Sequence, residues 1–522
     1  MKRCPTCQAT YADESLNFCR HDGAALIPFH SESATAVLAT GSVAGTAIQK
    51  TTALGRGSAK PRTINSLAVL PFENMSRDPN AEYLSDGITE SIINSLSQLR
   101  KLRVMARSTV FRYKGQAVDP QQVGRDLDVR AVLSGRVLQL GDDLIIGAEL
   151  VKVSDGSQLW GEQYKRKLSD IFEVQEEIAS EISGKLRLRL TGEQKKRLTR
   201  RHTESTEAYQ AYLRGRYYWN RRTEEGLKKG IEYFQQAIEK DPGYALAYAG
   251  LADSYGRFEY FGYLSSKETM PRAKAAAMKA LEVDDTLTEA RTSLAWARLH
   301  YDWDWLAAER EFKRAIDLNP DYTEAHHSYS HYLIAMGRTA ESLAESKRAL
   351  ELDPLDLVIN AHLGWHYLYA RQYDQSIEQS RRTLELEPNS LVAHWFLGRA
   401  LEQKAMYQEA AKAFEKSITI SDGSPTYVAA LGHAYAAAGK KNEALRILNE
   451  LKQQSKRTYV SPFNLAAISS GLGEKDQGFE WLEKAFEERS HWLVYLKVEP
   501  MLDGLRSDPR FTDLVRRVGL PK

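Results

Sequence analysis

The feature that most constrains the fold of this chain is a repeat of 34 residues that runs from about residue 205 to residue 490. One position of the repeat holds a small side chain in most units, at successive spacings of 43, 35 and then 34 residues: Ala237, Ala280, Ala315, Ala349, Thr383, Ser417, Leu451 and Ala485. A fixed period of this length is typical of stacked helix pairs, in which each unit packs on its neighbours. We therefore expect an all-α solenoid of about eight units over residues 205–490.

The ends of the units carry helix-stopping residues, because proline cannot continue the helix that precedes it. These residues are Pro242, Asp285, Pro320, Pro354, Pro388 and Asp422. The outer face of a terminal unit has no neighbour and needs a cover. Residues 491–522 are expected to supply it, with a capping helix from Pro500 to Leu520.

Cysteine occurs three times, always within the first nineteen residues. Cys4 and Cys7 form a Cys-x-x-Cys turn, and Cys19 is followed by His21 and Asp22. Zinc prefers four ligands in a tetrahedron, so the three thiolates need one partner, either His21 or Asp22. The stretch resembles the short bacterial zinc-ribbon knuckle, which implies a structural zinc ion in residues 1–28. The alternative is a degenerate knuckle that has lost its metal.

A tether is expected to follow the knuckle over residues 29–63. Of the 33 residues from Ser31 to Thr63, 21 are serine, threonine, alanine or glycine. Such a composition buries too little apolar surface to offset the entropy lost on ordering, so it favours a flexible linker.

Residues 64–200 have the pattern of an α/β domain. A buried-type apolar run over residues 67–72 precedes a helical periodicity over residues 81–99. Further strands are expected over residues 102–106 and 129–138. A short helix is expected over residues 120–127 and a long one over residues 170–190. The turn dipeptide Asp155-Gly156 predicts a hairpin between two more strands.

Several sequence stretches of this domain resemble a known bacterial family. The matching stretches are Leu67-Ala68-Val69-Leu70-Pro71-Phe72, Tyr83 to Glu90, Leu133-Ser134-Gly135-Arg136-Val137 and Leu159-Trp160. They resemble the TolB-amino-terminal-like or FlgO-like domain, which precedes helical repeats in cyclase-, kinase- and CadC-like signalling chains. The resemblance implies no catalytic residue. Asp86 is interpreted as a helix N-cap, the common role of aspartate beside the start of a helix.

The repeats resemble tetratricopeptide repeats. Apolar-glycine pairs and aromatic residues stand at the positions that this family prescribes: Leu363-Gly364, Leu397-Gly398, Leu431-Gly432, Phe234, Phe312 and Phe414. In this register the first helix of each pair lines an inner groove. The resemblance places six side chains on its concave surface: His327, His331, Trp365, Trp395, Arg399 and His433.

Tryptophan and arginine dominate binding hot spots, so these six residues are predicted to hold an extended peptide or the tail of a protein partner. An alternative is that Trp365 and Trp395 only pack between units. The spacing of His327 and His331, and of His362 and His366, is also one that could bind a metal. The pattern places no acidic or cysteine partner beside these histidines, which favours recognition.

The formal net charge of +2 gives no electrostatic reason to expect a nucleic acid or an anionic membrane as partner. No run of eighteen apolar residues predicts a membrane span. Phosphate-binding, metalloprotease, hydrolase and kinase motifs do not occur, so neither an enzyme nor a small-molecule substrate is expected. The sequence predicts a cytoplasmic, non-catalytic protein-interaction scaffold. The alternative is a regulatory component of a bacterial signalling or transcription system, with the α/β domain as sensor or effector.

Overall fold

The computed structural model describes three short N-terminal strands and residues 64–521, with gaps at 77, 100–101, 187, 189, 193–200 and 261. The short strands are β1 (Lys2–Arg3), β2 (Thr10–Tyr11) and β3 (Ile27–Pro28), which form an antiparallel sheet with β1 at its centre. The predicted zinc ligands lie outside the described residues, as does the predicted tether: Cys4, Cys7, Cys19, His21, Asp22 and residues 29–63.

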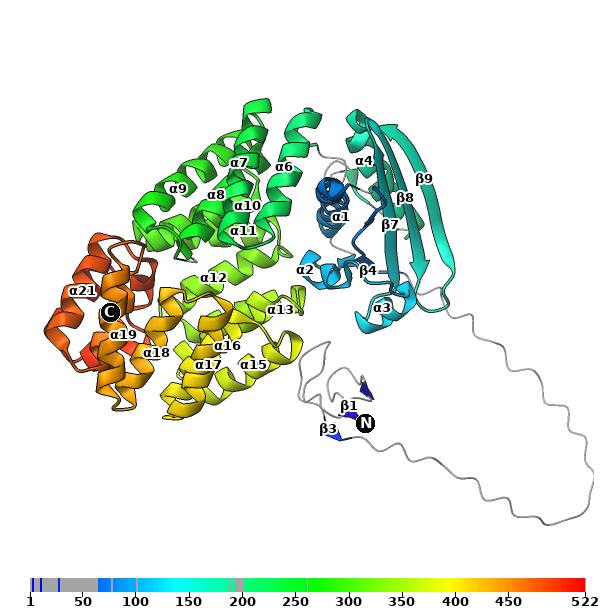
Figure 1. Ribbon diagram of the computed structural model, residues 1–522. Helices are drawn as coiled ribbons and strands as arrows, with labels where there is room; N and C mark the ends of the chain where they lie inside the picture. The colour runs from blue at the N-terminus through cyan, green and yellow to red at the C-terminus, as the bar shows by residue number, and fades with distance from the viewer. Residues whose placement is uncertain are drawn as a thin grey trace, which may run out of the picture.

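A mixed sheet of six strands forms the centre of the α/β domain (Figure 1). The strands run in the order β6-β4-β7-β8-β9, and β5 also pairs with β7. Strand β4 is parallel to β6 and β7, whereas β7, β8 and β9 form an antiparallel meander. Their bounds are β4 (Ser66–Val69), β5 (Glu73–Asn74), β6 (Arg103–Val104), β7 (Ala131–Leu140), β8 (Asp143–Lys152) and β9 (Gln158–Lys167).

The helices of this domain are α1 (Glu82–Ser97), α2 (Arg107–Val110), α3 (Pro120–Asp126) and α4 (Ile171–Lys185), with 3-10 turns η1 (Pro79–Ala81), η2 (Phe111–Tyr113) and η3 (Leu168–Asp170). Helix α2 and turn η2 were not predicted. Helices α1 and α4 pack against each other, and α1 lies between the sheet and the first repeat helix, α6 (Figure 1). Buried Tyr209 and Leu213 of α6 belong to the same hydrophobic core as the sheet.

In the described part of the chain the repeats consist of eight helix pairs, which curve around a concave face (Figure 1). The pairs are α6 (Thr206–Trp219) with α7 (Glu224–Lys240), α8 (Ala245–Tyr260) with α9 (Ser266–Val283), α10 (Thr288–Ala297) with α11 (Trp305–Leu318), α12 (Thr323–Ala335) with α13 (Thr339–Leu352), α14 (Leu357–Tyr369) with α15 (Tyr373–Leu386), α16 (Leu391–Gln403) with α17 (Tyr407–Ile420), α18 (Pro425–Ala437) with α19 (Lys441–Gln454), and α20 (Pro462–Gly471) with α21 (Lys475–Glu487).

The spacing of 43 residues between Ala237 and Ala280 exceeds the period of 34, and the extra residues lie mainly in the helices of the second unit. Helices α8 and α9 have 16 and 18 residues, against 13 and 14 in α12 and α13. The turn between α8 and α9 is only slightly longer than the turn between α12 and α13. A π-helical turn, η4 (Arg298–Asp302), extends α10 in the next unit.

The end of the chain departs from the single capping helix predicted over residues 500–520. Two 3-10 helices, η5 (His491–Tyr495) and η6 (Pro500–Leu505), precede α22 (Pro509–Val518). Phe511, Leu514 and Val518 of α22 are buried, and Val515 is half-buried. Among the helices that the structure describes, none combines the length and the apolar character needed to cross a membrane.

Candidate binding groove of the repeats

The concave face is built by the first helix of each pair. These helices pack against one another from pair to pair, as α8 does against α10, α14 against α16 and α18 against α20. The second helices lie on the outside (Figure 1). All six residues predicted to line the groove are on first helices: His327, His331, Trp365, Trp395, Arg399 and His433. The structure thus brings them to the same side of the array.

These six side chains are nevertheless buried rather than open to a partner. Trp365 is 1% exposed, Arg399 2% and His331 0%. All of them except His327 contact the C-terminal segment, defined here as residues 490–505, which contains η5 and η6. The prediction of an open groove at these residues therefore differs from the structure, because the chain places its own residues there.

Aromatic rings form the centre of this contact. Trp492 of the C-terminal segment meets Trp395 edge-on, with 5.7 Å between ring centroids, and stacks on Phe463 at 6.1 Å. Tyr495 lies edge-on to Trp365, with ring centroids 4.9 Å apart. Such pairs contribute about 0.5–1.5 kcal/mol beyond the apolar area that they bury. Trp365 and Trp395 thus pack against the C-terminal segment as well as against the neighbouring unit.

Charged groups fix the register of the segment in the groove. The Glu499 carboxylate, which has no exposed surface, pairs with the Arg399 guanidinium and accepts a hydrogen bond of 2.7 Å from the Tyr369 hydroxyl. His433 pairs with Glu402 and donates through Nε2 to the carbonyl oxygen of Met501, at 3.2 Å. Burial lowers the pKa of His433, but the Glu402 carboxylate outweighs it and raises that pKa overall.

The segment also reaches the early units of the array. His491 pairs with Glu259 of α8, and Tyr495 lies with its hydroxyl oxygen 3.2 Å from Nε2 of His300 in η4. These contacts were missed by the sequence reasoning, which assigned residues 491–522 to the cap. A signal was present: residues 491–502 hold an aromatic and apolar run without helical periodicity, and such a run is unsuited to a solvent-exposed tail.

The first half of the concave face has an open hollow. Its interior volume is about 60 Å³, or about 690 Å³ when the space open to solvent at its mouth is included. It lies between α6, α8, α10 and α12, and its polar lining includes Arg216, Asp253, Arg257, Glu289, Ser293 and Glu324. The charges on its wall are partly paired, since Arg257 contacts Glu324 at 2.8 Å and Asp253 at 3.5 Å. None of these residues was among the predicted groove residues.

Two buried carboxylates mark places where the α/β domain is docked on the array. Glu90 of α1 lies between Arg107 of α2, at 2.9 Å, and Arg216 of α6, at 2.7 Å. At the second place the hydroxyls of Ser108 and Thr109 donate to the Asp353 carboxylate, which follows α13. Burial, aided by the neighbouring Asp356 carboxylate, raises the pKa of Asp353 to about 7.

The interpretation of Asp86 as an N-cap was wrong. Helix α1 begins four residues earlier, and Ala81 occupies the capping position. Asp86 is buried inside the helix, where its carboxylate accepts bonds of 2.6 and 2.7 Å from Lys114 Nζ. Burial raises the pKa of Asp86, although Lys114 opposes that shift. Its role in the structure is an ion pair that holds η2 against α1.

Comparison with known families matches two parts of the chain. Residues 63–181 match the family described as HilA/YgeH-like transcriptional regulator, second domain. Residues 362–425 match the tetratricopeptide repeat family, which confirms the prediction of such repeats. The resemblance to the TolB-like domain stays a prediction, since the family that matches the α/β domain is the HilA/YgeH-like one.

Curated relatives match only part of their own lengths. "Putative adenylate cyclase 3" of Rhizobium meliloti (strain 1021) is 35% identical over 237 residues, which are 44% of this chain and 40% of the relative. "Transcriptional regulator HilA" of Salmonella typhimurium (strain LT2) is 24% identical over 291 residues, 54% of this chain and 49% of the relative. The chain thus spans less than half the length of either relative.

Solved structures are similar to parts of the chain at low identity. The Cut9–Hcn1 hetero-tetramer of the APC/C matches 67% of this chain and 72% of the solved chain, at 13% identity and a TM-score of 0.40. The protein TTC0263 of Thermus thermophilus matches 37% and 98%, at 18% identity and a TM-score of 0.32. From the family matches and its own geometry, the chain joins an α/β domain similar to the second domain of HilA-like regulators to a solenoid of tetratricopeptide repeats.

Proposed function

We propose that this chain is a non-catalytic interaction scaffold that binds an extended peptide of a protein partner in the hollow between α6, α8, α10 and α12. The observation that carries this proposal is that the C-terminal segment fills much of the concave face but does not line the hollow between α6, α8, α10 and α12. An open, partly apolar cleft with a few convergent polar groups is the usual form of a binding site.

The chain's own groove contacts indicate how a peptide would bind. In the second half, the C-terminal segment presents aromatic rings to tryptophans and one carboxylate to a buried arginine. The hollow repeats this mixture, with Trp296 and Tyr322 beside Arg216 and Arg257. Both arginines already have counterions, since Arg216 pairs with Glu90 and Arg257 pairs with Glu324. A peptide with an aromatic side chain therefore fits the chemistry of the hollow.

The test uses the full chain to select peptides from a random displayed library, and then compares their affinities for two variants. Ser293→Trp places a large ring in the hollow, where Ser293 is half-buried. Ser455→Trp makes the same change at an exposed site after α19. We expect Ser293→Trp to weaken binding at least about tenfold, while Ser455→Trp leaves it unchanged. Selection of no peptide, or equal affinities for the two variants, would overturn the proposal.

A regulatory component of a signalling or transcription system is the second candidate function. It is favoured by the similarity of residues 63–181 to a domain of HilA-like regulators. In that case the α/β domain acts as sensor or effector and the repeats receive the partner. Saturable binding of a nucleotide or other small molecule by the full chain would support this candidate, provided that Ser293→Trp leaves it unchanged.

A further inference from the structure

Three histidine side chains meet in the interior of the array, where α12 faces α14. The nitrogens that point inward are Nε2 of His327, Nε2 of His331 and Nδ1 of His362. The three separations between them are 2.8 Å for His327–His362, 3.1 Å for His331–His362 and 3.2 Å for His327–His331. The three rings, none more than 4% exposed, enclose one point with a nearly equilateral triangle of nitrogens.

Hydrogen bonds among the three rings do not account for this triangle. Each imidazole nitrogen offers either one N–H or one lone pair, so the three contacts cannot all be hydrogen bonds. At least one of them sets lone pair against lone pair, or N–H against N–H, at hydrogen-bonding distance. A cation between the nitrogens uses all three lone pairs at once.

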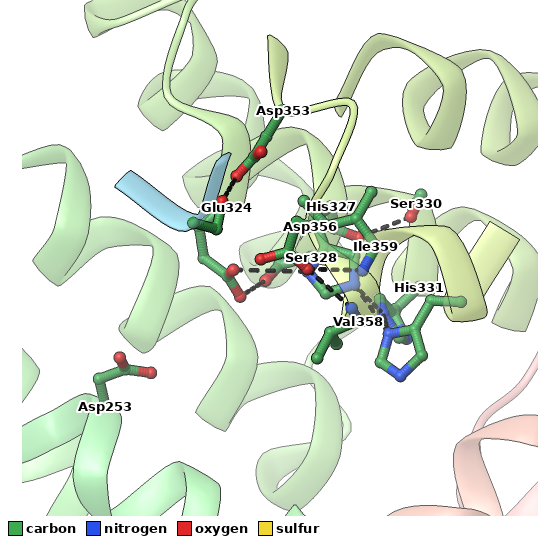
Figure 2. A network of polar contacts seen from close by, with 12 residues as sticks. Asp253, Glu324, His327, Ser328, Ser330, His331, Asp353, Asp356, Val358 and Ile359 are labelled. Atoms are coloured by element: carbon green, nitrogen blue, oxygen red, sulfur yellow. Dashed lines mark hydrogen bonds and ion pairs between the residues drawn. The ribbon is translucent and has the colours of Figure 1, made fainter. Parts of the chain in front are cut away.

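The outer nitrogen of each ring faces an oxygen that can fix its tautomer. Nδ1 of His327 lies 3.4 Å from the Glu324 carboxylate, and Nε2 of His362 lies 2.7 Å from the Tyr260 hydroxyl. Nδ1 of His331 lies 3.5 Å from the hydroxyl of Tyr495, on the C-terminal segment. Figure 2 shows Glu324, His327 and His331 following one another along α12. Metal-bound histidines typically donate their second nitrogen to such a partner, which leaves the inner lone pair free.

The surroundings keep the imidazoles of His331 and His362 in the form that binds metals. Burial lowers the pKa of His331 and of His362 well below the ordinary value, and the neighbouring histidines lower it further. These two rings are therefore neutral at physiological pH. The carboxylate of Glu324, which also pairs with Arg257 at 2.8 Å, places a negative charge near the triangle.

We infer that His327, His331 and His362 form a zinc site inside the solenoid. Two nitrogens that bind a tetrahedral zinc ion at about 2.0–2.1 Å lie about 3.3 Å apart, close to the separations found here. An ion equidistant from the three nitrogens lies about 1 Å out of their plane. Zinc is the divalent ion that favours tetrahedral imidazole sites without redox chemistry. Such an ion joins two units of the array and, through Tyr495, the C-terminal segment.

The site is tested in the full chain with Cys4→Ser and Cys7→Ser, so that the predicted N-terminal knuckle contributes no zinc. The metal-free protein is titrated with Zn²⁺ against a chromophoric chelator, and bound zinc is measured by mass spectrometry. We expect one zinc ion per chain. Adding His331→Gln should remove it, whereas His394→Gln, a histidine on α16 outside the cluster, should leave it.

Substitution with Co²⁺ provides a readout that needs no histidine variant. In the Cys4→Ser, Cys7→Ser chain, Co²⁺ should give the intense d–d bands of a tetrahedral site without thiolate charge transfer. If circular dichroism shows that the His331→Gln chain does not fold, the zinc content of the His362→Gln chain and the cobalt spectrum test the site instead. Absence of both bound zinc and tetrahedral cobalt bands, or equal zinc in the His331→Gln and His394→Gln chains, would overturn the assignment.

Discussion

At the residue scale, the pair of Arg399 and Glu499 sets the C-terminal segment in place. Both side chains are almost fully buried, at 2% and 0% exposed. Isolating one charge in such a position is costly, because its partner no longer compensates for the lost water. The pair therefore fixes the position of Glu499 in the groove, while its net contribution to the stability of the fold is small.

Replacing Glu499 with glutamine should lower the free energy of unfolding by about 3–5 kcal/mol, since it leaves the Arg399 charge buried without a counterion. The matched control is Asp503→Asn, which breaks the pairs of Asp503 with Arg371, after α14, and with Arg506 in the chain just beyond the C-terminal segment. Arg371 and Asp503 are 36% and 45% exposed, so the loss of these pairs should cost about 1 kcal/mol or less. Urea denaturation measures both, and equal losses would contradict the account.

The histidine cluster shows how far single residues could be predicted. The i, i+4 spacing identified His327 with His331 and His362 with His366 as possible metal pairs. The structure joins the first pair to His362, while His366 Nδ1 contacts the Ser346 hydroxyl instead. Spacing within one helix fixes which residues share a face, but the partner across the groove depends on how successive units stack. The nearby acid, Glu324, lies one turn before His327 on α12 and was missed.

At the scale of elements, the contact between α2 and the turn after α13 depends on pH. A carboxyl whose pKa is raised in the folded state stabilises the fold below its unfolded pKa of about 4, and this contribution is lost as pH rises through the folded value. Because the pKa of Asp353 is raised to about 7, the loss falls between about pH 4 and pH 7. The docking of the α/β domain should weaken over that window.

Asp353→Asn removes the ionisation and keeps one oxygen to accept from Ser108 or Thr109. At pH 8 the variant should be more stable than the wild type, by up to roughly 1.4 kcal/mol for each unit by which the pKa is raised. At pH 4 the advantage should vanish. Chemical denaturation at several pH values measures the difference, and a gap that stays constant from pH 4 to pH 8 would refute the assignment.

Most elements of the α/β domain could be predicted, because apolar runs, helical periodicity and a turn dipeptide mark them locally. The four-residue helix α2 was missed, since so short an element leaves no period. The repeat helices follow from small residues and helix stops. The 3-10 helices within residues 491–505 could not be predicted from local sequence patterns, because their side chains pack into a groove that other units form.

At the scale of the whole molecule, the C-terminal segment makes distant units depend on one another. In an ordinary solenoid each repeat contacts only its neighbours, so a defect stays local. Here Trp492 meets Trp365, Trp395 and Phe463, and the adjacent His491 reaches Glu259 on α8. The array is thus tied across its concave face as well as along its length.

Trp492→Ala should cost about 3–5 kcal/mol, as expected for truncation of a buried tryptophan, and should speed amide hydrogen exchange in α8, α14 and α16. The control is Trp481→Ala on α21, a half-buried ring that contacts Lys452 of α19. Its effect should stay within α19 and α21. Faster exchange confined to α20 and α21 in Trp492→Ala would show that the segment does not couple the units.

The position of the C-terminal segment also bears on how the chain folds as it is made. Residues 490–505 leave the ribosome after every repeat helix, yet they fill the interior between units that were synthesised more than two hundred residues earlier. Until they arrive, the inner tryptophans and the buried Arg399 stay exposed to water, a condition that favours chaperone binding or association between chains. The early units of this solenoid therefore reach their final packing only after residues 490–505 have been synthesised.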